Sequence, residues 1–417
     1  MPSVGERKQV SFDPKQQSFN PFVSGMMDDP YPYYAALRDS DPVHWNDDLQ
    51  MYFISRYADV LHIGRDRQRF IRGNAVRSAF AEFQGTIIEE ALSNLFTIDP
   101  PDHTRLKGFI SRAFTRPRIE ALRGRITEIS EGLLDEAGVE SRSGSLKLVS
   151  DFSYPLPFQV ICELMGVPID ERDAVRERTR YITPLIDPFL DPDAPAKGAE
   201  ACAWFKDYLT TLVVERRRLR AAGATPPPGL VSELVELSDQ EKMSPSELFA
   251  MCVVLFIAGF ENVTNLVSNA VRALVENPAQ QAALRKEPNL YGNLPDEALR
   301  YYSTTQYNAR ETAAEVELSG RSIPKGSVVV MLRGAANRDE RRFADPDSFF
   351  LRRSDSHAHL GFGEGATFCT GAGLARLETE VAIRCLFKRT KDVAISEWTQ
   401  GPTKLFWGPS EVRLEYN

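Results

Sequence analysis

The chain has 417 residues, of which 42% are hydrophobic and 26% are charged, so it is long enough for one large or two smaller globular domains. Its formal net charge of −8 argues against general nucleic-acid binding. The 5 cysteines form no C-x-x-C pair, which indicates neither a zinc site nor a disulfide framework, and their odd number is typical of a reducing compartment.

The first fifty residues predict a short helix and a small sheet. The opening "MPSVGERKQVSFDPKQQ" lacks the apolar stretch of a secretion signal, so we expect a cytoplasmic protein. "PYPYYAALRDSD" predicts a helix. "PVHW" and "MYFIS" predict strands of a hairpin.

Residues 100 to 300 are dominated by long amphipathic runs with few β-branched clusters, which predicts helices. The stretch "GATPPPGL" (Gly223 to Leu230) interrupts two of these runs. Hydrophobic periodicity is equally dense on both sides, so we interpret it as an exposed connection between helices. We therefore expect a single domain over residues 1–417.

The clearest helix begins at Ser244. Ser244 is a good N-cap, Pro245 suits the first helical position, and Glu247 completes a capping box; Asn277 and Pro278 end the helix. The span predicts a rod of roughly 50 Å. Its apolar run "LFAMCVVLFIAGF" is too short to cross a bilayer, so we expect a core helix and no membrane insertion.

Short strands are predicted in the last third of the chain. "AEVELSGRSIPKGSVVVML" carries β-branched runs, as do "KDVAISE" and "EVRLEYN" near the C-terminus. The predicted fold is thus mainly α with a small β region (α+β).

The stretch "HLGFGEGATFCTGAGLAR" surrounds Cys369 with closely spaced glycines. A lone cysteine is more often a packing residue, but such glycines allow positive φ angles and the close approach of a flat group. Helical spacing resumes at Leu374, which places Cys369 near a helix N-terminus, where a thiolate is favoured. The pattern predicts a loop that presents an anionic sulfur to a metal or cofactor.

Five stretches, in this order along the chain, resemble the cytochrome P450 family. "DPPDHTRLKGFISRAFT" (99–115) is similar to its heme-contacting helix, and "AGFEN" (258–262) to its oxygen-binding motif. "EALR" (297–300) matches Glu-x-x-Arg, with Arg353 where the third member of that ion-pair cluster is expected. "FGEGATFCTG" (362–371) is similar to the heme-binding loop. The resemblance implies a helix-rich body around a heme, with the long helix at its centre.

The resemblance also implies a cofactor, heme b, and the residues that hold it. Cys369 is expected to be the axial thiolate ligand of the iron, in a loop with Phe362, Gly363 and Gly371. Cations are expected to bind the propionates; the candidates are His103, Lys107 and Arg310. Lys107 stands where the family usually has arginine, and a lysine cannot make the bidentate contact with a propionate that arginine makes. For His103 the alternative is a core histidine.

The other positions implied by the resemblance have structural or catalytic roles. Glu297, Arg300 and Arg353 are expected to hold the fold around the Cys369 loop rather than to contact substrate. The expected catalytic residues of the long helix are Ala258, Gly259, Glu261 and Asn262.

Two residues depart from the family pattern. Thr367 replaces the histidine before the cysteine, and Asn262 replaces a threonine that sits over the oxygen. Asparagine has no hydroxyl proton to pass on. Either water or substrate fills that role, or the chemistry is altered. Thr264 is predicted to lie on another face of the helix.

The resemblance implies a substrate pocket above the heme. The variable loop would be "RGNAVRSAFAEFQGTIIEEALSNLF" (72–96) and the lid "TPLIDPFLDPDAPAKG" (183–198). These segments are mostly apolar, which suggests a hydrophobic small molecule such as a secondary metabolite, hydroxylated or epoxidised with O₂. The expected lining residues are Val254, Ile257, Gln306, Asn308 and Phe406.

Electrons would come from NAD(P)H through ferredoxin reductase and ferredoxin, and we expect a monomer. A basic stretch on the heme-contacting helix is a candidate docking patch or a solvated face; its residues are Arg105, Lys107, Arg112, Arg116 and Arg118. Two alternatives stay open: a heme-thiolate enzyme for isomerisation, dehydration or coupling, and a heme sensor without turnover. Glu261 and the Ala258-Gly259 niche argue against the sensor.

Overall fold

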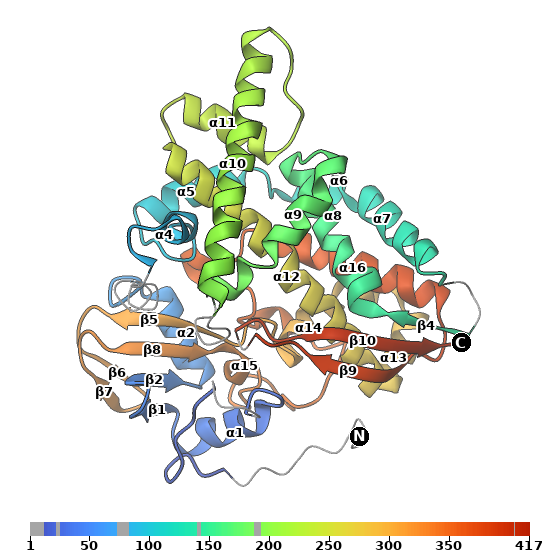
Figure 1. The fold of residues 1–417 in the computed structure, drawn as a ribbon. Helices are drawn as coiled ribbons and strands as arrows, with labels where there is room; N and C mark the ends of the chain where they lie inside the picture. The colour runs from blue at the N-terminus through green and yellow to red at the C-terminus, as the bar shows by residue number, and fades with distance from the viewer. Residues whose placement is uncertain (1–11, 22–25, 73–82, 140–142, 187–192, 404) are drawn as a thin grey trace.

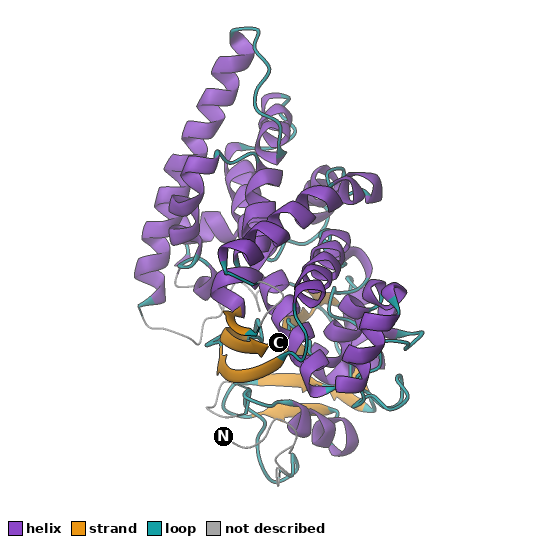
Figure 2. Cartoon of the chain, turned by 90° about the vertical axis from the view of Figure 1, so that its right-hand side faces the viewer, coloured by secondary structure: helices purple, strands orange, loops and turns teal. Residues whose placement is uncertain are grey.

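A computed structural model of the chain describes residues 12–21, 26–72, 83–139, 143–186, 193–403 and 405–417 (Figure 1). Helices fill most of the molecule, and the strands gather in its lower part (Figure 2). The helices are α1 (Tyr31–Ser40), α2 (Tyr57–Arg65), α4 (Ile87–Leu92), α5 (Asp102–Ser111), α6 (Arg116–Ala121), α7 (Arg123–Glu136), α8 (Pro155–Met165), α9 (Arg172–Thr179), α10 (Ala194–Ala221), α11 (Leu230–Asp239), α12 (Pro245–Glu276), α13 (Pro278–Lys286), α14 (Leu294–Tyr301), α15 (Arg333–Ala336) and α16 (Ala372–Arg389).

The strands form three small sheets. One has the order β1-β2-β8-β5-β3, in which β2 and β8 are parallel and the other pairs antiparallel. The second has the order β4-β10-β9, and the third is the pair β6-β7. The strands are β1 (Val43–Asn46), β2 (Met51–Ile54), β3 (Phe70–Ile71), β4 (Gly144–Lys147), β5 (Tyr307–Thr312), β6 (Val316–Leu318), β7 (Arg321–Ile323), β8 (Val328–Leu332), β9 (Ala394–Gln400) and β10 (Pro409–Tyr416).

Helix α12 is the central element. The Ser244 hydroxyl accepts from the Glu247 N–H, and the Glu247 carboxylate accepts from the Ser244 N–H, so the predicted capping box is confirmed. The N-terminal half of α12 packs in one apolar cluster and its C-terminal half in another. Among the described residues, α12 alone is long and apolar enough to span a membrane, but 78% of its most apolar window is buried, as in a core helix.

The other predicted elements are also present. Strands β1 and β2 form the antiparallel hairpin expected near the N-terminus, with Val43 opposite Ile54. Residues 222–229 are mostly exposed and connect α10 to α11 at the end of the molecule farthest from the sheets (Figure 1). This is the expected connection between helices.

Candidate functional site

The loop that carries Cys369 lies between a 3-10 turn at Gly365–Thr367 and the start of α16. The Cys369 N–H donates to the carbonyl of Phe362 at 2.7 Å, which folds the loop back on itself. Gly363 and Gly365 have φ angles of 76° and 58°, in the left-handed region that favours glycine. A Cβ atom at Gly363 would also lie 3.1 Å from the Thr367 carbonyl oxygen, so both glycines are required by the turn.

The ionisation of the Cys369 thiol differs from the expectation. Although the residue keeps exposed surface, surrounding protein desolvates the sulfur and raises the pKa of the thiol. The N–H groups of Gly371 and Ala372 and the charge of Lys107 oppose this shift without reversing it. The surrounding protein thus opposes ionisation of this thiol, and a bound metal cation would favour the thiolate.

The middle of helix α12 has solvent-accessible residues at one place only. From Leu248 to Val271, every residue is buried except Ala258, Gly259, Glu261 and Asn262. Positions 258, 261 and 262 share one face of the helix, because they are three and four residues apart. A Cβ atom at Gly259 would lie 2.5 Å from the Ile161 side chain, so glycine lets α8 pack closely beside this opening. The structure thus brings the four predicted catalytic residues together at an accessible niche.

Polar groups line the niche. Burial raises the pKa of the Glu261 carboxyl, so this acid keeps its proton to a higher pH than an exposed glutamate does. The Asn262 Oδ1 accepts from the Thr305 hydroxyl at 3.3 Å. The Thr264 hydroxyl donates instead to the Phe260 carbonyl at 3.0 Å, which confirms that Thr264 lies on another face.

The segment after α14 and the turn near the C-terminus meet beside this niche, as expected for pocket walls. Thr305 forms an isolated bridge with Phe406. Phe406 is buried but belongs to none of the core clusters, and Asn308 is half-buried at the start of β5. The structure therefore places Asn308 and Phe406 on segments that border the niche.

Other predicted lining residues have different positions. The prediction for Gln306 is wrong: its side chain has no exposed surface, and its amide donates to the Ser303 carbonyl at 2.6 Å and lies 3.1 Å from the Tyr34 hydroxyl. Val254 and Ile257 are 4% and 2% exposed within the apolar cluster of α12, so they offer little surface to a ligand. The predicted variable loop and lid lie partly outside the described residues.

Two buried arginines lie near the predicted cofactor site. Arg72 follows β3, and its guanidinium donates to the carbonyls of Leu95 and Ile98 while its Nε has no partner. Burial and the charge of Arg310 lower the pKa of Arg72 to about 9. Burial and the charge of Arg333 lower the pKa of Arg310 to about 10. Neither guanidinium has an ion-pair partner among the described residues.

His103 lies beside these arginines. Its Nδ1 is 3.5 Å from the Nη1 of Arg67. Burial, followed by the charges of Arg72 and Arg67, lowers the pKa of His103 to about 4. Arg67 lies 3.7 Å from Asp99. Around the neutral His103 ring, the four guanidiniums of Arg67, Arg72, Arg310 and Arg333 outnumber the two neighbouring carboxylates, Asp99 and Glu364, which favours the binding of an anion.

Lys107 differs from its expected role. Its Nζ donates to the carbonyls of Ala366 and Phe368 at 2.7 and 2.6 Å, which ties α5 to the loop immediately before Cys369. The ammonium is thus engaged with the loop backbone, whereas the sequence predicts that it binds a propionate.

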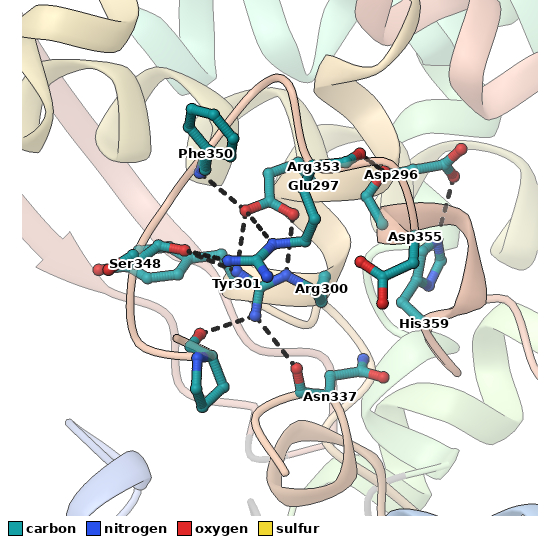
Figure 3. Close-up of polar contacts among 12 residues, drawn as sticks. Asp296, Glu297, Arg300, Tyr301, Asn337, Ser348, Phe350, Arg353, Asp355 and His359 are labelled. Carbon is teal, nitrogen blue, oxygen red and sulfur yellow. Dashed lines mark hydrogen bonds and ion pairs between the residues drawn. The ribbon is translucent and has the colours of Figure 1, made fainter. Parts of the chain in front are cut away.

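The predicted ion-pair cluster is present behind the Cys369 loop (Figure 3). Glu297 and Arg300 form two bonds of 2.8 Å and have no exposed surface, and Arg353 contacts Glu297 at 3.3 Å. The two guanidiniums also bind backbone carbonyls of the segment 337–348, and the Phe350 N–H donates to Glu297. The cluster therefore fixes the segment that leads to the cysteine loop.

A second polar group borders this cluster. Asp296 lies 3.0 Å from the His359 ring (Figure 3). It also accepts from Arg376 at 2.8 Å. Burial opposes ionisation of Asp296, but His359 and Arg376 outweigh it and lower the pKa of the carboxyl. This group joins α14 to both ends of the cysteine loop.

Comparison with known proteins identifies the family, because residues 44–291 and 294–397 match the family described as Cytochrome P450. The chain belongs to this family. Among curated relatives, the cytochrome P450 monooxygenase PikC of Streptomyces venezuelae is 36% identical over 92% of this chain and 88% of its own length. Cytochrome P450 107B1 of Saccharopolyspora erythraea is 35% identical over 93% of each chain.

Solved structures agree with this assignment. The chain resembles a crystal structure of CalO2 with a TM-score of 0.88 and 29% identity over 96% of this chain and 98% of that one. It also resembles P450BioI in complex with an acyl carrier protein, with a TM-score of 0.84 and 30% identity over 94% and 99% of the two chains. The protein is thus a cytochrome P450 monooxygenase with a heme-thiolate cofactor.

The residues present fit that cofactor. Buried arginines with an unpartnered Nε suit the two carboxylates of a heme, and the Gly363 turn presents a single sulfur ligand. Sequence reasoning missed Arg67, Arg72 and Arg333. Arg72 lies where the sequence predicts a variable loop, and nothing in its neighbours signals that it is buried. Only the backbone path after β3 places it beside Arg310.

Proposed function

We propose that this cytochrome P450 hydroxylates or epoxidises a hydrophobic small molecule, a secondary metabolite, in the cytoplasm, using O₂ and electrons from NAD(P)H delivered by ferredoxin. The observation that carries this proposal is the opening in α12 at Ala258, Gly259, Glu261 and Asn262, a polar niche within an otherwise buried helix. Relatives named 6-deoxyerythronolide B hydroxylase and vitamin D(3) 25-hydroxylase support a hydrophobic substrate.

Several groups of this chain hold the cofactor and serve the reaction. Cys369 would ligate the iron, while Arg72 and Arg310 would bind the propionates of the heme. When bound, the heme supplies activation of O₂, favoured by thiolate ligation. Burial raises the pKa of the Glu261 carboxyl, so this acid would keep its proton to a higher pH than an exposed glutamate. The apolar residues of α12 on either side exclude water from the niche.

The electron donor would dock near α5 and α6. Arg112 and Arg116 are exposed there, and Arg118 is exposed but paired with Glu233 at 3.2 Å. Arg105 is engaged with Glu247, and Lys107 holds the cysteine loop. The proposed docking patch is therefore reduced to Arg112, Arg116 and Arg118, which would attract an acidic ferredoxin.

The test is a binding and turnover experiment. Myristic acid, testosterone, vitamin D₃ and a 14-membered macrolactone are screened by the shift of the heme Soret band, and the compounds that bind are incubated with NAD(P)H, reductase and ferredoxin. We expect an oxygenated product that requires both proteins. Product without added electrons would favour isomerisation or dehydration, and binding without any product would favour a sensor.

A further inference from the structure

The niche of α12 lacks a threonine but not a hydroxyl group. Asn262 stands where the family has threonine, and its Oδ1 accepts a hydrogen bond from the hydroxyl of Thr305 at 3.3 Å. Thr305 belongs to the segment between α14 and β5, distant in sequence from α12. Both residues are only partly buried, whereas Ser303, Thr304 and Gln306 around Thr305 are buried. The side chain of Thr305 therefore faces the same accessible niche as Asn262.

The backbone on both sides of Thr305 is fixed. The Gln306 N–H donates to the Leu405 carbonyl at 3.0 Å, and the Trp407 N–H donates to the Thr304 carbonyl. Thr305 itself pairs with Phe406 in an isolated bridge. A hydroxyl on this segment consequently has a defined position relative to α12.

The hydroxyls of α12 itself are engaged elsewhere. The Thr264 hydroxyl donates to the Phe260 carbonyl, and that of Ser268 lies 2.9 Å from both the Thr264 carbonyl and the Ser153 hydroxyl. Both residues are buried. Neither can serve the niche without breaking a buried hydrogen bond.

We propose that Thr305 is a positioning residue of the oxygen niche, where its hydroxyl, held by Asn262, replaces the hydroxyl that the helix motif lacks. The inference rests on the proposed function. While its proton is donated to Asn262 Oδ1, the Thr305 Oγ1 accepts a hydrogen bond from a water molecule, and the Asn262 amide N–H groups remain as further donors. The pair thereby orders a water that delivers protons to the oxygen being reduced.

The predicted consequence concerns how oxygen is reduced, and it can be measured without knowledge of the substrate. Two electrons and two protons convert O₂ to hydrogen peroxide, so one NAD(P)H is consumed per O₂. Four electrons and four protons convert O₂ to two waters, so two NAD(P)H are consumed per O₂. Poor proton delivery shifts the balance toward peroxide.

The experiment measures NAD(P)H, O₂ and peroxide with the heme-loaded protein, ferredoxin and reductase, and no added compound. We call the fraction of consumed O₂ that is reduced to water the water-forming share. For Thr305→Val we expect this share to fall about fivefold, as for the loss of one hydrogen bond. Thr305→Ser, which keeps the hydroxyl, should stay within about twofold of wild type. The matched control Thr264→Val removes a hydroxyl outside the niche and should leave the share unchanged.

A rescue variant separates this role from a structural one. In Asn262→Thr/Thr305→Val the helix regains its own hydroxyl, so the water-forming share should return to within about twofold of wild type. The Soret spectrum and heme content of each variant are measured alongside, because a folding defect would lower both and would not be rescued.

Two results would overturn the proposal: an unchanged share in Thr305→Val, or an equal fall in Thr305→Ser. A fall in Thr183→Val without a fall in Thr305→Val would also overturn it and would assign the role to the Thr183 hydroxyl beside Glu261. If the heme-loaded wild-type protein consumes no O₂ above the background of NAD(P)H, reductase and ferredoxin without it, the proposed function itself fails. Consumption of O₂ with an unchanged share contradicts the inference alone.

Discussion

Asn262 occupies the centre of the niche, and its amide contributes a donor and an acceptor rather than a hydroxyl. Asn262→Ala removes the acceptor of the Thr305 hydroxyl, so we expect less product per NAD(P)H and more peroxide while substrate still binds. Asn262→Thr should keep this coupling within a few fold, because threonine restores a hydroxyl. The measurement is product per NAD(P)H in the three proteins. Identical coupling in all three would remove Asn262 from oxygen activation.

Cys369 is the residue whose role has the sharpest spectroscopic signature. Cys369→Ser replaces the sulfur by an oxygen that the loop would still hold in place, because the Phe362 carbonyl binds the backbone N–H and not the side chain. We expect loss of the thiolate spectrum of the reduced CO complex. Cys385→Ser, which changes a buried cysteine on α16, is the control and should keep it. Survival of the spectrum in Cys369→Ser would refute the ligand assignment.

His103 makes stability depend on pH. Its pKa is lowered from 6.5 to about 4, so between these values the unfolded chain binds a proton that the folded chain does not. Stability is thus full above pH 6.5 and is lost as pH falls toward 4. We expect the free energy of unfolding of heme-free protein to fall by about 1 kcal/mol through this residue between pH 6.5 and 5. His103→Gln should remove this fall, and His357→Gln, an exposed histidine, should keep it.

At the scale of elements, the cluster around Glu297 joins α14 to the segment that leads to the cysteine loop (Figure 3). Arg300→Ala leaves the fully buried Glu297 carboxylate with one cation fewer, and it should lower the free energy of unfolding by about 3–5 kcal/mol. We expect low heme content and a low melting temperature. Arg352→Ala, an exposed arginine beside Arg353, is the control. Normal heme content with altered product in Arg300→Ala would point to a substrate contact instead.

The sequence predicts the features that depend on neighbouring residues better than those that depend on contacts between distant parts of the chain. The capping box of α12 and the i,i+3 pair of Glu297 and Arg300 are local patterns, and both are present as expected. The position of Gln306 depends on Tyr34, and the burial of Arg72 depends on strand β3. Neither feature can be recognised from the residues next to Gln306 or Arg72 in the sequence. Local motifs therefore located the site, whereas the long-range packing of the chain decides which of its polar side chains face it.

At the scale of the whole molecule, the basic residues of α5 and α6 divide into two kinds. Arg105 joins α5 to the capping box of α12 through Glu247, and Lys107 joins it to the cysteine loop. Arg112 and Arg116 are exposed, and no ion pair is found for them among the described residues. A partner attracted by charge would therefore meet these two arginines in a protein that is acidic as a whole.

Charge reversal tests this docking surface. We expect Arg112→Glu and Arg116→Glu to slow electron transfer from ferredoxin about tenfold while the Soret shift with substrate stays unchanged. The wild-type rate should fall as salt rises, because exposed charges are screened over ~8 Å at physiological ionic strength. In both variants this salt dependence should flatten, since part of the attraction is already gone.

The control is Lys325→Glu, which makes the same charge change at an exposed position in the turn between β7 and β8, outside α5 and α6. It alters the net charge of the protein as much as either arginine variant does. A local docking surface predicts that Lys325→Glu keeps both the rate and its salt dependence. If all three variants slow electron transfer equally, the overall charge of the protein and not this surface governs the encounter with ferredoxin. If substrate affinity falls along with the rate in the arginine variants, these residues act on the heme site rather than on docking.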